Sequence, residues 1–179
     1  MVLAAPAFAD GPSYNYIQGS YEDIEIDSAG GDVDGDGLGI AGSVEIADTW
    51  HAFASYTSAD FDFSVDFDQL LIGGGYHSPL NENVDLVARL AYIQLDASAF
   101  GFSADDDGFG VSVGLRGKVA ERVEAEGYIE YTDLDTSGDD TSFSGAAWYE
   151  FTDSFSLGLQ LGFGDDISSW GIGGRFFFD

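Results

Sequence analysis

Three alternating aspartates near the N-terminus form the pattern that most resembles a ligand site. Asp32, Asp34 and Asp36, followed by Gly37, match the first half of a calcium-binding loop, in which such carboxylates converge on a hard cation. The second half does not match, because position twelve is Ser43 where the loop needs a glutamate. We therefore expect a solvated acidic hairpin tip and no resident cofactor, although pooled carboxylates could hold calcium or magnesium weakly.

The two histidines are the second candidate. His51 and His77 are expected at the same ends of neighbouring strands and on the same face, with Asp48 nearby, so they could form a metal-binding or pH-sensitive pair. Ordinary polar residues inside the fold are the simpler interpretation. No nucleophile stands out near them, and the chain has no cysteine, so we expect no catalytic residues and no enzyme.

Composition restricts the class of protein. Lys and Arg number 5 against 33 Asp and Glu, giving a net charge of −28, which argues against a nucleic-acid partner. Hydrophobic residues make up 45% and aromatic residues 15%, too many for a disordered chain. We assign residues 1–9, which end in the cleavage-like Ala7-Phe-Ala9, to a signal-peptide remnant and residues 10–179 to one domain. An ordinary mobile N-terminus is the alternative for residues 1–9.

Polar and apolar residues alternate with a period of two along most of the chain, as in Phe109–Val119 and Phe155–Phe163. This predicts an all-β fold: a closed antiparallel up-and-down β-barrel of about ten strands, with eight still open. The expected strands are 14–27, 37–47, 50–59, 63–77, 84–97, 107–119, 123–135, 141–151, 155–165 and 168–178.

The expected connections are of two alternating kinds. Four are tight, and the other five hold 19 of the 24 aspartates. Because alternate connections of a meander lie at the same end, the aspartates are expected to crown one rim. The acidic spans are Asp23–Asp36, Asp60–Asp68, Asp96–Asp107, Asp133–Asp140 and Asp165–Asp166.

The position of the cations favours a polar lumen and an apolar exterior. Four of the five cations lie on the polar face of their strands, and Arg116 and Lys118 neighbour Glu124 and Glu126 on the next strand, so charge pairs across the lumen are natural. A soluble lipocalin-like barrel would place them outside, among far more surface lysines. The expected lumen charge network is Arg89, Arg116, Lys118, Arg175, Glu45, Glu124, Glu126, Glu130 and Glu150.

Aromatic residues are expected near both ends of the strands, as in the two interfacial girdles of a transmembrane β-barrel. Near the tight turns these are Tyr14, Tyr16, Trp50, Tyr76, Tyr149, Phe151, Phe155, Phe176 and Phe178. Near the acidic rim they are Tyr21, Tyr56, Phe67, Phe109, Tyr131, Phe143, Phe163 and Trp170.

Four segments carry a resemblance to a known group: Tyr14–Tyr21, Gly31–Gly37, Asp68–Tyr76 and Asp85–Tyr92. The chain resembles the small outer-membrane β-barrel proteins of Gram-negative bacteria, nearest the diffusible-signal-factor-regulated family, once proposed as an activator of plant immunity. The resemblance implies a barrel in the cell outer membrane with periplasmic termini, and it transfers no catalytic residues. Such barrels usually end on an aromatic residue that the assembly machinery reads, whereas here Asp179 follows Phe178.

Together these features predict a non-enzymatic outer-membrane protein with an acidic extracellular rim and a structural or surface-interaction role. The alternatives are a small cation-preferring, porin-like channel and the soluble lipocalin-like barrel. Expected partners are outer-membrane lipid, lipopolysaccharide and the barrel assembly machinery, with divalent cations at the rim, and a monomer is expected.

Overall fold

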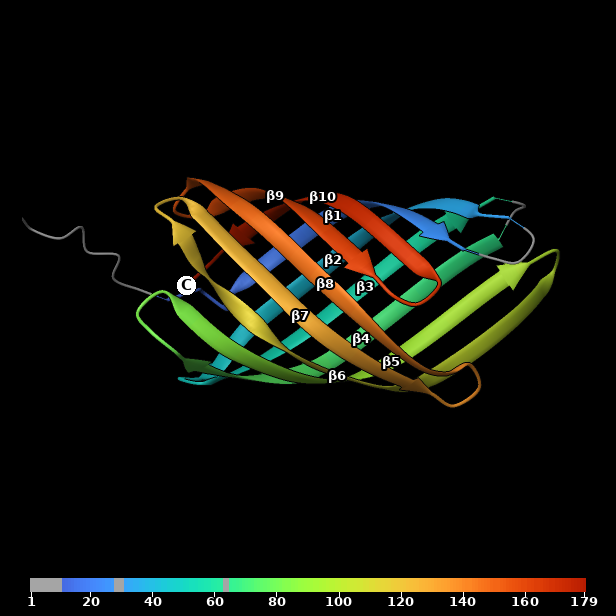
Figure 1. Ribbon diagram of the computed structural model, residues 1–179, viewed down its shortest axis with the longest axis horizontal. Coiled ribbons are helices and arrows are strands. Elements are labelled where there is room, and N and C mark those ends of the chain that lie inside the picture. Colours follow the sequence, from blue (N-terminus) through green and yellow to red (C-terminus); the bar gives the residue numbers. More distant parts are fainter. Residues whose placement is uncertain (1–10, 28–30, 63–64) are drawn as a thin grey trace, which may run out of the picture.

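The computed structural model describes residues 11–27, 31–62 and 65–179, which form ten strands (Figure 1). The expected signal remnant, 1–9, lies outside the described residues. The strands are β1 (Tyr16–Ile26), β2 (Val33–Ala47), β3 (Trp50–Phe61), β4 (Val65–Pro79), β5 (Val84–Ala99), β6 (Phe102–Ala120), β7 (Val123–Leu134), β8 (Gly138–Thr152), β9 (Phe155–Phe163) and β10 (Ile167–Phe177).

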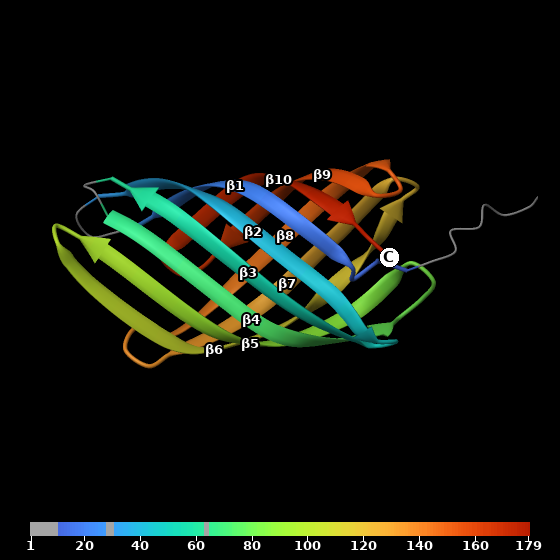
Figure 2. The ribbon, with the colours of Figure 1, turned by 180° about the vertical axis from the view of Figure 1, so that it is seen from behind.

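Each strand pairs antiparallel with its neighbours in sequence, and the sheet closes on itself between β1 and β10. The closing ladder runs from Tyr16 opposite Phe177 to Ile26 opposite Ile167, and the barrel is seen from behind in Figure 2. The predicted all-β, closed up-and-down barrel is confirmed, with ten strands and not eight. Within the described residues, no helix is long and apolar enough to cross a membrane.

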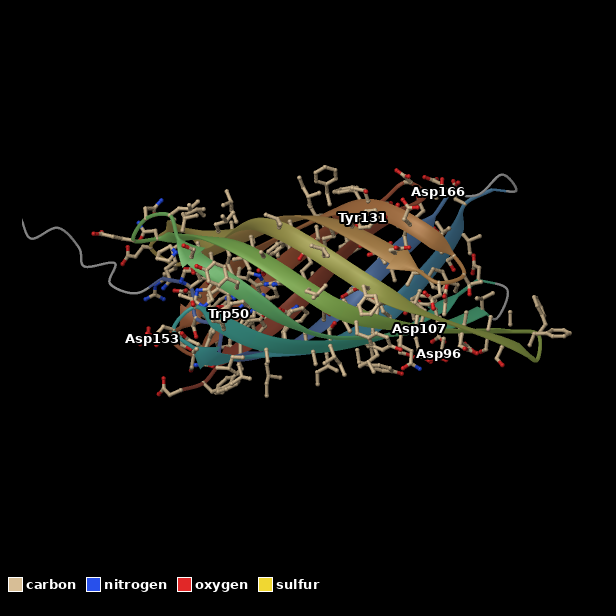
Figure 3. The ribbon with its side chains drawn as sticks, turned by 90° about the horizontal axis from the view of Figure 1, so that it is seen from below. Trp50, Asp96, Asp107, Tyr131, Asp153 and Asp166 are labelled. Carbon is tan, nitrogen blue, oxygen red and sulfur yellow. The ribbon has the colours of Figure 1, made fainter. Side chains whose placement is uncertain are left out.

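The barrel has two unlike ends. Trp50 and Asp153 lie at the end where the C-terminus emerges, which we call the short-turn end, and Asp96, Asp107 and Asp166 lie at the opposite, acidic end (Figure 3). The β5–β6 hairpin reaches furthest at the acidic end (Figure 1). The labelled residues therefore differ between the two ends.

The strands run further at the acidic end than expected. Only residues 100–101 connect β5 to β6, and β2 already begins at Val33. Asp34 and Asp36 therefore lie on a strand, on the same outward face as Leu38, and not at a converging hairpin tip. Side-chain alternation cannot reveal such extensions where both faces are polar, but the backbone ladder continues because every amide in a closed sheet finds a partner.

The exterior of the barrel is apolar along the middle of the strands. Leu38, Leu90 and Leu159 are 68%, 58% and 60% exposed, while the alternate residues, including Arg116 and Arg175, are buried inside. A soluble protein does not expose a continuous apolar belt of this kind. The lipocalin-like alternative, which needs the opposite polarity, is therefore wrong.

Most of the expected girdle aromatics do face outward, but three do not. Tyr14 and Tyr16 are buried in the lumen at 1% and 8% exposure. Phe67 belongs to the inward-facing set of β4 and lies edge-on to Phe61, with ring centroids 6.4 Å apart. The alternation of apolar and polar residues is interrupted between Phe67 and Leu70, so the sequence could not show on which face of the strand Phe67 lies.

Candidate functional site

Four charged side chains from three strands form a compact group inside the barrel, which we call the arginine–glutamate core: Arg116 on β6, Glu124 and Glu126 on β7, and Arg175 on β10. Glu124 Oε1 lies 2.9 Å from Arg116 Nη2 and 2.9 Å from Arg175 Nη1. Glu126 Oε1 lies 2.7 Å from Arg175 Nη2, and Glu126 Oε2 lies 3.8 Å from Arg116 Nε. Both arginine side chains are at most 3% exposed, so each charge depends on the others for compensation.

Aromatic rings and amides complete the surroundings of this core. The Arg175 guanidinium carbon lies 4.1 Å from the Trp148 ring and 4.2 Å from the Tyr16 ring. Trp148 Nε1 donates a hydrogen bond to Glu126 Oε1 at 2.9 Å, and Arg175 donates two to Gln18 Oε1. These contacts hold the Arg175 guanidinium plane between two aromatic rings.

The other residues of the expected network lie apart from this core. Lys118 Nζ pairs with Glu150 Oε1 at 3.1 Å in a partly exposed site. Glu45 is exposed at the short-turn end, and Glu130 accepts a hydrogen bond from Ser144; among the described residues, neither lies within 4.0 Å of a cation. Arg89 is hydrogen-bonded to Tyr128 instead of a carboxylate.

The segment before β1 enters the lumen from the short-turn end, which the sequence analysis missed. Arg116 Nη2 donates to the Ser13 carbonyl at 2.9 Å, and Tyr14 Oη donates to Asp85 Oδ2 at 3.0 Å. The Tyr14 ring is 1% exposed. Residues 11–15 therefore act as a plug at this end.

The histidines flank this plug. The Tyr14 ring stacks on His51 at 4.6 Å and on His77 at 3.9 Å between ring centroids, while the two histidine rings are 5.7 Å apart. His77 Nδ1 lies 3.4 Å from Asp85 Oδ2, and neither nitrogen of His51 has a hydrogen-bond partner among the described residues. The expected pair thus meets through Tyr14, and Asp48 is exposed in its turn.

Trp148 depends on a glycine of the neighbouring strand. An ideal Cβ on Gly158 would lie 2.5 Å from Trp148 Cε3 and 2.7 Å from the Ala147 carbonyl oxygen. We expect Gly158→Ala to lower the free energy of unfolding by about 1–3 kcal/mol, because the Trp148 ring must shift. Urea unfolding followed by tryptophan fluorescence measures this change. In the matched Gly145→Ala control the added Cβ would lie 3.5 Å from its nearest neighbour, so equal losses in both variants would contradict the argument.

A cavity of about 680 Å³ occupies the lumen between the arginine–glutamate core and the acidic end. Its lining includes Arg175, Arg89 and Glu126 toward the core, and Asp140 and Ile167 toward the acidic end. Five side chains that do not line the cavity form a closed layer beneath it, and each is at most 2% exposed: Trp148, Arg116, Tyr14, His51 and Glu124. The cavity is therefore a blind cup.

Aspartates face one another directly across the strands at the acidic end. Asp23, Asp36, Asp60 and Asp66 form one such row across β1 to β4. Asp68, Asp96 and Asp105 form another across β4 to β6. In the described part of the chain, no group of three or more acidic or histidine side chains is arranged to hold a metal ion. Asp32 is exposed beside Asp34 and Asp36 and does not converge with them on one point.

Known proteins share this architecture. A family model described as outer membrane protein beta-barrel domain matches residues 1–163. No curated protein sequence matches the chain.

Two solved structures illustrate the likeness. One is the β domain of the Bordetella autotransporter BrkA, at 14% identity and a TM-score of 0.53, covering 92% of this chain and 99% of that one. The other is the KdgM porin in complex with disordered oligogalacturonate, at 10% identity and a TM-score of 0.51, with coverage of 92% and 99%. At such identities the likeness concerns the fold alone.

Proposed function

The chain belongs to the family of outer membrane protein β-barrel domains, and from that premise we propose that it is a non-enzymatic surface protein whose lumen does not conduct. Its location is the outer membrane of a Gram-negative bacterium, with the short-turn end in the periplasm and the acidic end outside. Its role is structural or consists in surface interactions made through the acidic rim.

The observation that carries the proposal is the closed layer beneath the cavity. Arg116 is 0% exposed, Tyr14 1% and Glu124 2%, so side chains block the lumen between the acidic and short-turn ends. A small barrel is narrow enough for side chains to close its lumen at one level, unlike the wide bore of large porins. A solute entering from the acidic end meets paired charges and no continuous path.

The acidic end supports the surface role. Phe100 and Phe102, at the tip of the projecting β5–β6 hairpin, are 78% and 81% exposed. Phe100 adopts a positive φ of 52°, an uncommon conformation for a residue with a side chain. Exposed aromatic side chains at such a tip do not stabilise the barrel, and they are suited to contact with a partner.

The proposal also includes a specific family within the outer-membrane barrels and a set of partners. The four segments quoted above support membership of the diffusible-signal-factor-regulated family. The outward apolar belt supports contact with outer-membrane lipid, the rows of aspartates support weak calcium or magnesium bridges to lipopolysaccharide phosphates, and the aromatic C-terminal strand supports reading by the assembly machinery. The closed sheet leaves no unpaired edge, which supports a monomer.

A small cation-preferring channel is the second candidate, and the cavity open toward the acidic end is the observation in its favour. If the cup were connected to the short-turn end, the surrounding carboxylates would select cations. The closed layer makes this the weaker candidate.

Planar-bilayer recording separates the two candidates. The purified folded chain should show no steady conductance steps, because no path crosses the arginine–glutamate core and the plug. A known porin inserted in the same bilayers serves as the positive control, and a faster-migrating unheated band on a gel shows that the chain used was a folded barrel. Steady, cation-selective steps would replace the surface protein by the channel.

A further inference from the structure

Arg89 differs from the other lumenal cations because it lacks a carboxylate partner. Arg116 and Arg175 each pair with both core glutamates, and Lys118 pairs with Glu150. Within the described ranges, by contrast, no carboxylate oxygen lies within 4.0 Å of Arg89. Arg89 is only partly buried, and the Tyr128 hydroxyl to which it bonds donates in turn to Glu126 Oε2 at 3.2 Å, so the guanidinium reaches a carboxylate only through that hydroxyl.

The surroundings of Arg89 hold its guanidinium in one place. Nη2 donates to Tyr128 Oη at 2.9 Å, and the guanidinium carbon lies 4.3 Å from the Tyr128 ring and 5.6 Å from the Phe53 ring. Nε is buried without a hydrogen-bond acceptor. The Tyr128 hydroxyl and the two rings therefore hold the guanidinium group in one place.

Arg89 lies on the lining of the cup, and so does a second unused donor. Gln160 Oε1 accepts a hydrogen bond from Gln18 at 2.9 Å, but Gln160 Nε2 is buried without an acceptor. Both residues line the cavity, together with Phe53 and Tyr128. The inner part of the cup thus presents the positive charge of Arg89, beside the Gln160 side chain, to an anionic oxygen ligand.

The remaining wall of the same cup has the opposite charge. Glu22, Glu130 and Asp140 line it, and among the described residues none of them pairs with a cation. Among the described residues, Glu22 accepts a hydrogen bond from Ser20, and Glu130 accepts one from Ser144. A free anion would be repelled by these carboxylates, and a simple cation would be repelled by Arg89.

We propose that the cup binds a small zwitterion, such as an amino acid or a short peptide, with its carboxylate on Arg89 and its ammonium group toward Glu130, Glu22 and Asp140. This site goes beyond the surface role proposed above and does not depend on conduction. A volume of about 680 Å³ falls in the range of about 300–1,000 Å³ found for small-molecule sites.

Four forms of one dipeptide test the charge requirement. Alanyl-alanine is the zwitterion, its N-acetyl derivative is the anion, its C-terminal amide is the cation, and the doubly capped form is neutral. Titration calorimetry on the full chain in nanodiscs should give a Kd for the zwitterion about tenfold lower than for any capped form, because each cap removes one charge-assisted contact. Equal affinities, no binding of the zwitterion, or tighter binding of the anion would each overturn the proposal.

Two substitutions test which side chain binds the carboxylate of the ligand and which binds its ammonium group. Arg89→Gln should remove the preference for a free carboxylate, so that alanyl-alanine and its amide bind equally, while Glu130→Gln should weaken the preference for a free ammonium group. Arg122→Gln is the matched control, because Arg122 lies in a tight turn and bonds the Phe151 carbonyl, away from the cup. An unheated gel verifies folding of each variant. If Arg89→Gln leaves the zwitterion preference intact in a folded barrel, Arg89 is not the site.

Discussion

Glu124→Gln should lower the free energy of unfolding by about 3–5 kcal/mol, because it removes one partner from a buried ion-pair group. Glu124 Oε1 is shared by Arg116 and Arg175, at 2.9 Å from a nitrogen of each, and its side chain is 2% exposed. Glutamine keeps the shape and one acceptor oxygen but not the charge. Two buried guanidinium groups are then left with Glu126 alone. Urea unfolding in lipid vesicles, followed by tryptophan fluorescence, measures the loss.

The control is the Glu-to-Gln substitution in the neighbouring ion pair, Lys118–Glu150. Glu150 lies 3.1 Å from Lys118, but the two side chains are 19% and 28% exposed, so water screens their charges. Glu150→Gln should change the free energy of unfolding by no more than about 1 kcal/mol. Similar losses in both variants would show that burial of the arginine–glutamate core does not set its contribution to stability.

The fold was predictable because its sequence signal is local. Alternation along Phe155–Phe163 and the tight turns between alternate pairs of strands follow from the period of two and from turn chemistry. Closure between β1 and β10 follows from the need to remove sheet edges. These rules also place Arg116 and Glu124 on the inner face.

The candidate site was less predictable because depth in a barrel depends on register around the whole sheet. Glu45 and Glu124 are both polar-face residues, yet Glu124 meets two arginines and Glu45 is exposed at the mouth. The entry of Tyr14 between the histidines could not be foreseen, since residues 11–15 lack the periodicity that assigns a face. The free charge of Arg89 likewise emerges only when all ten strands are in register.

A cation placed on the outer face should separate a membrane barrel from a soluble one. Leu159 is the central residue of β9, 60% exposed, with the exposed rings of Phe155 and Phe163 at the two ends of the strand. Leu159→Arg should lower the free energy of unfolding in lipid vesicles by about 2–4 kcal/mol, the penalty for a basic residue at the bilayer midplane. Denaturant titration of the refolded chain in vesicles gives this number.

Depth is what makes that result specific to a bilayer. Thr141 shares the outward face of β8 with Phe143 but lies nearer the acidic end and carries no apolar side chain, so Thr141→Arg should change the unfolding free energy by at most about 1 kcal/mol. For a soluble barrel the difference between the two variants would disappear. Replacing a solvent-exposed leucine by arginine in water removes exposed apolar surface and does not destabilise the folded state. Equal effects at both positions in vesicles would therefore contradict an apolar belt embedded in lipid. A larger loss at Leu159 than at Thr141 in vesicles is therefore what an apolar belt embedded in lipid requires.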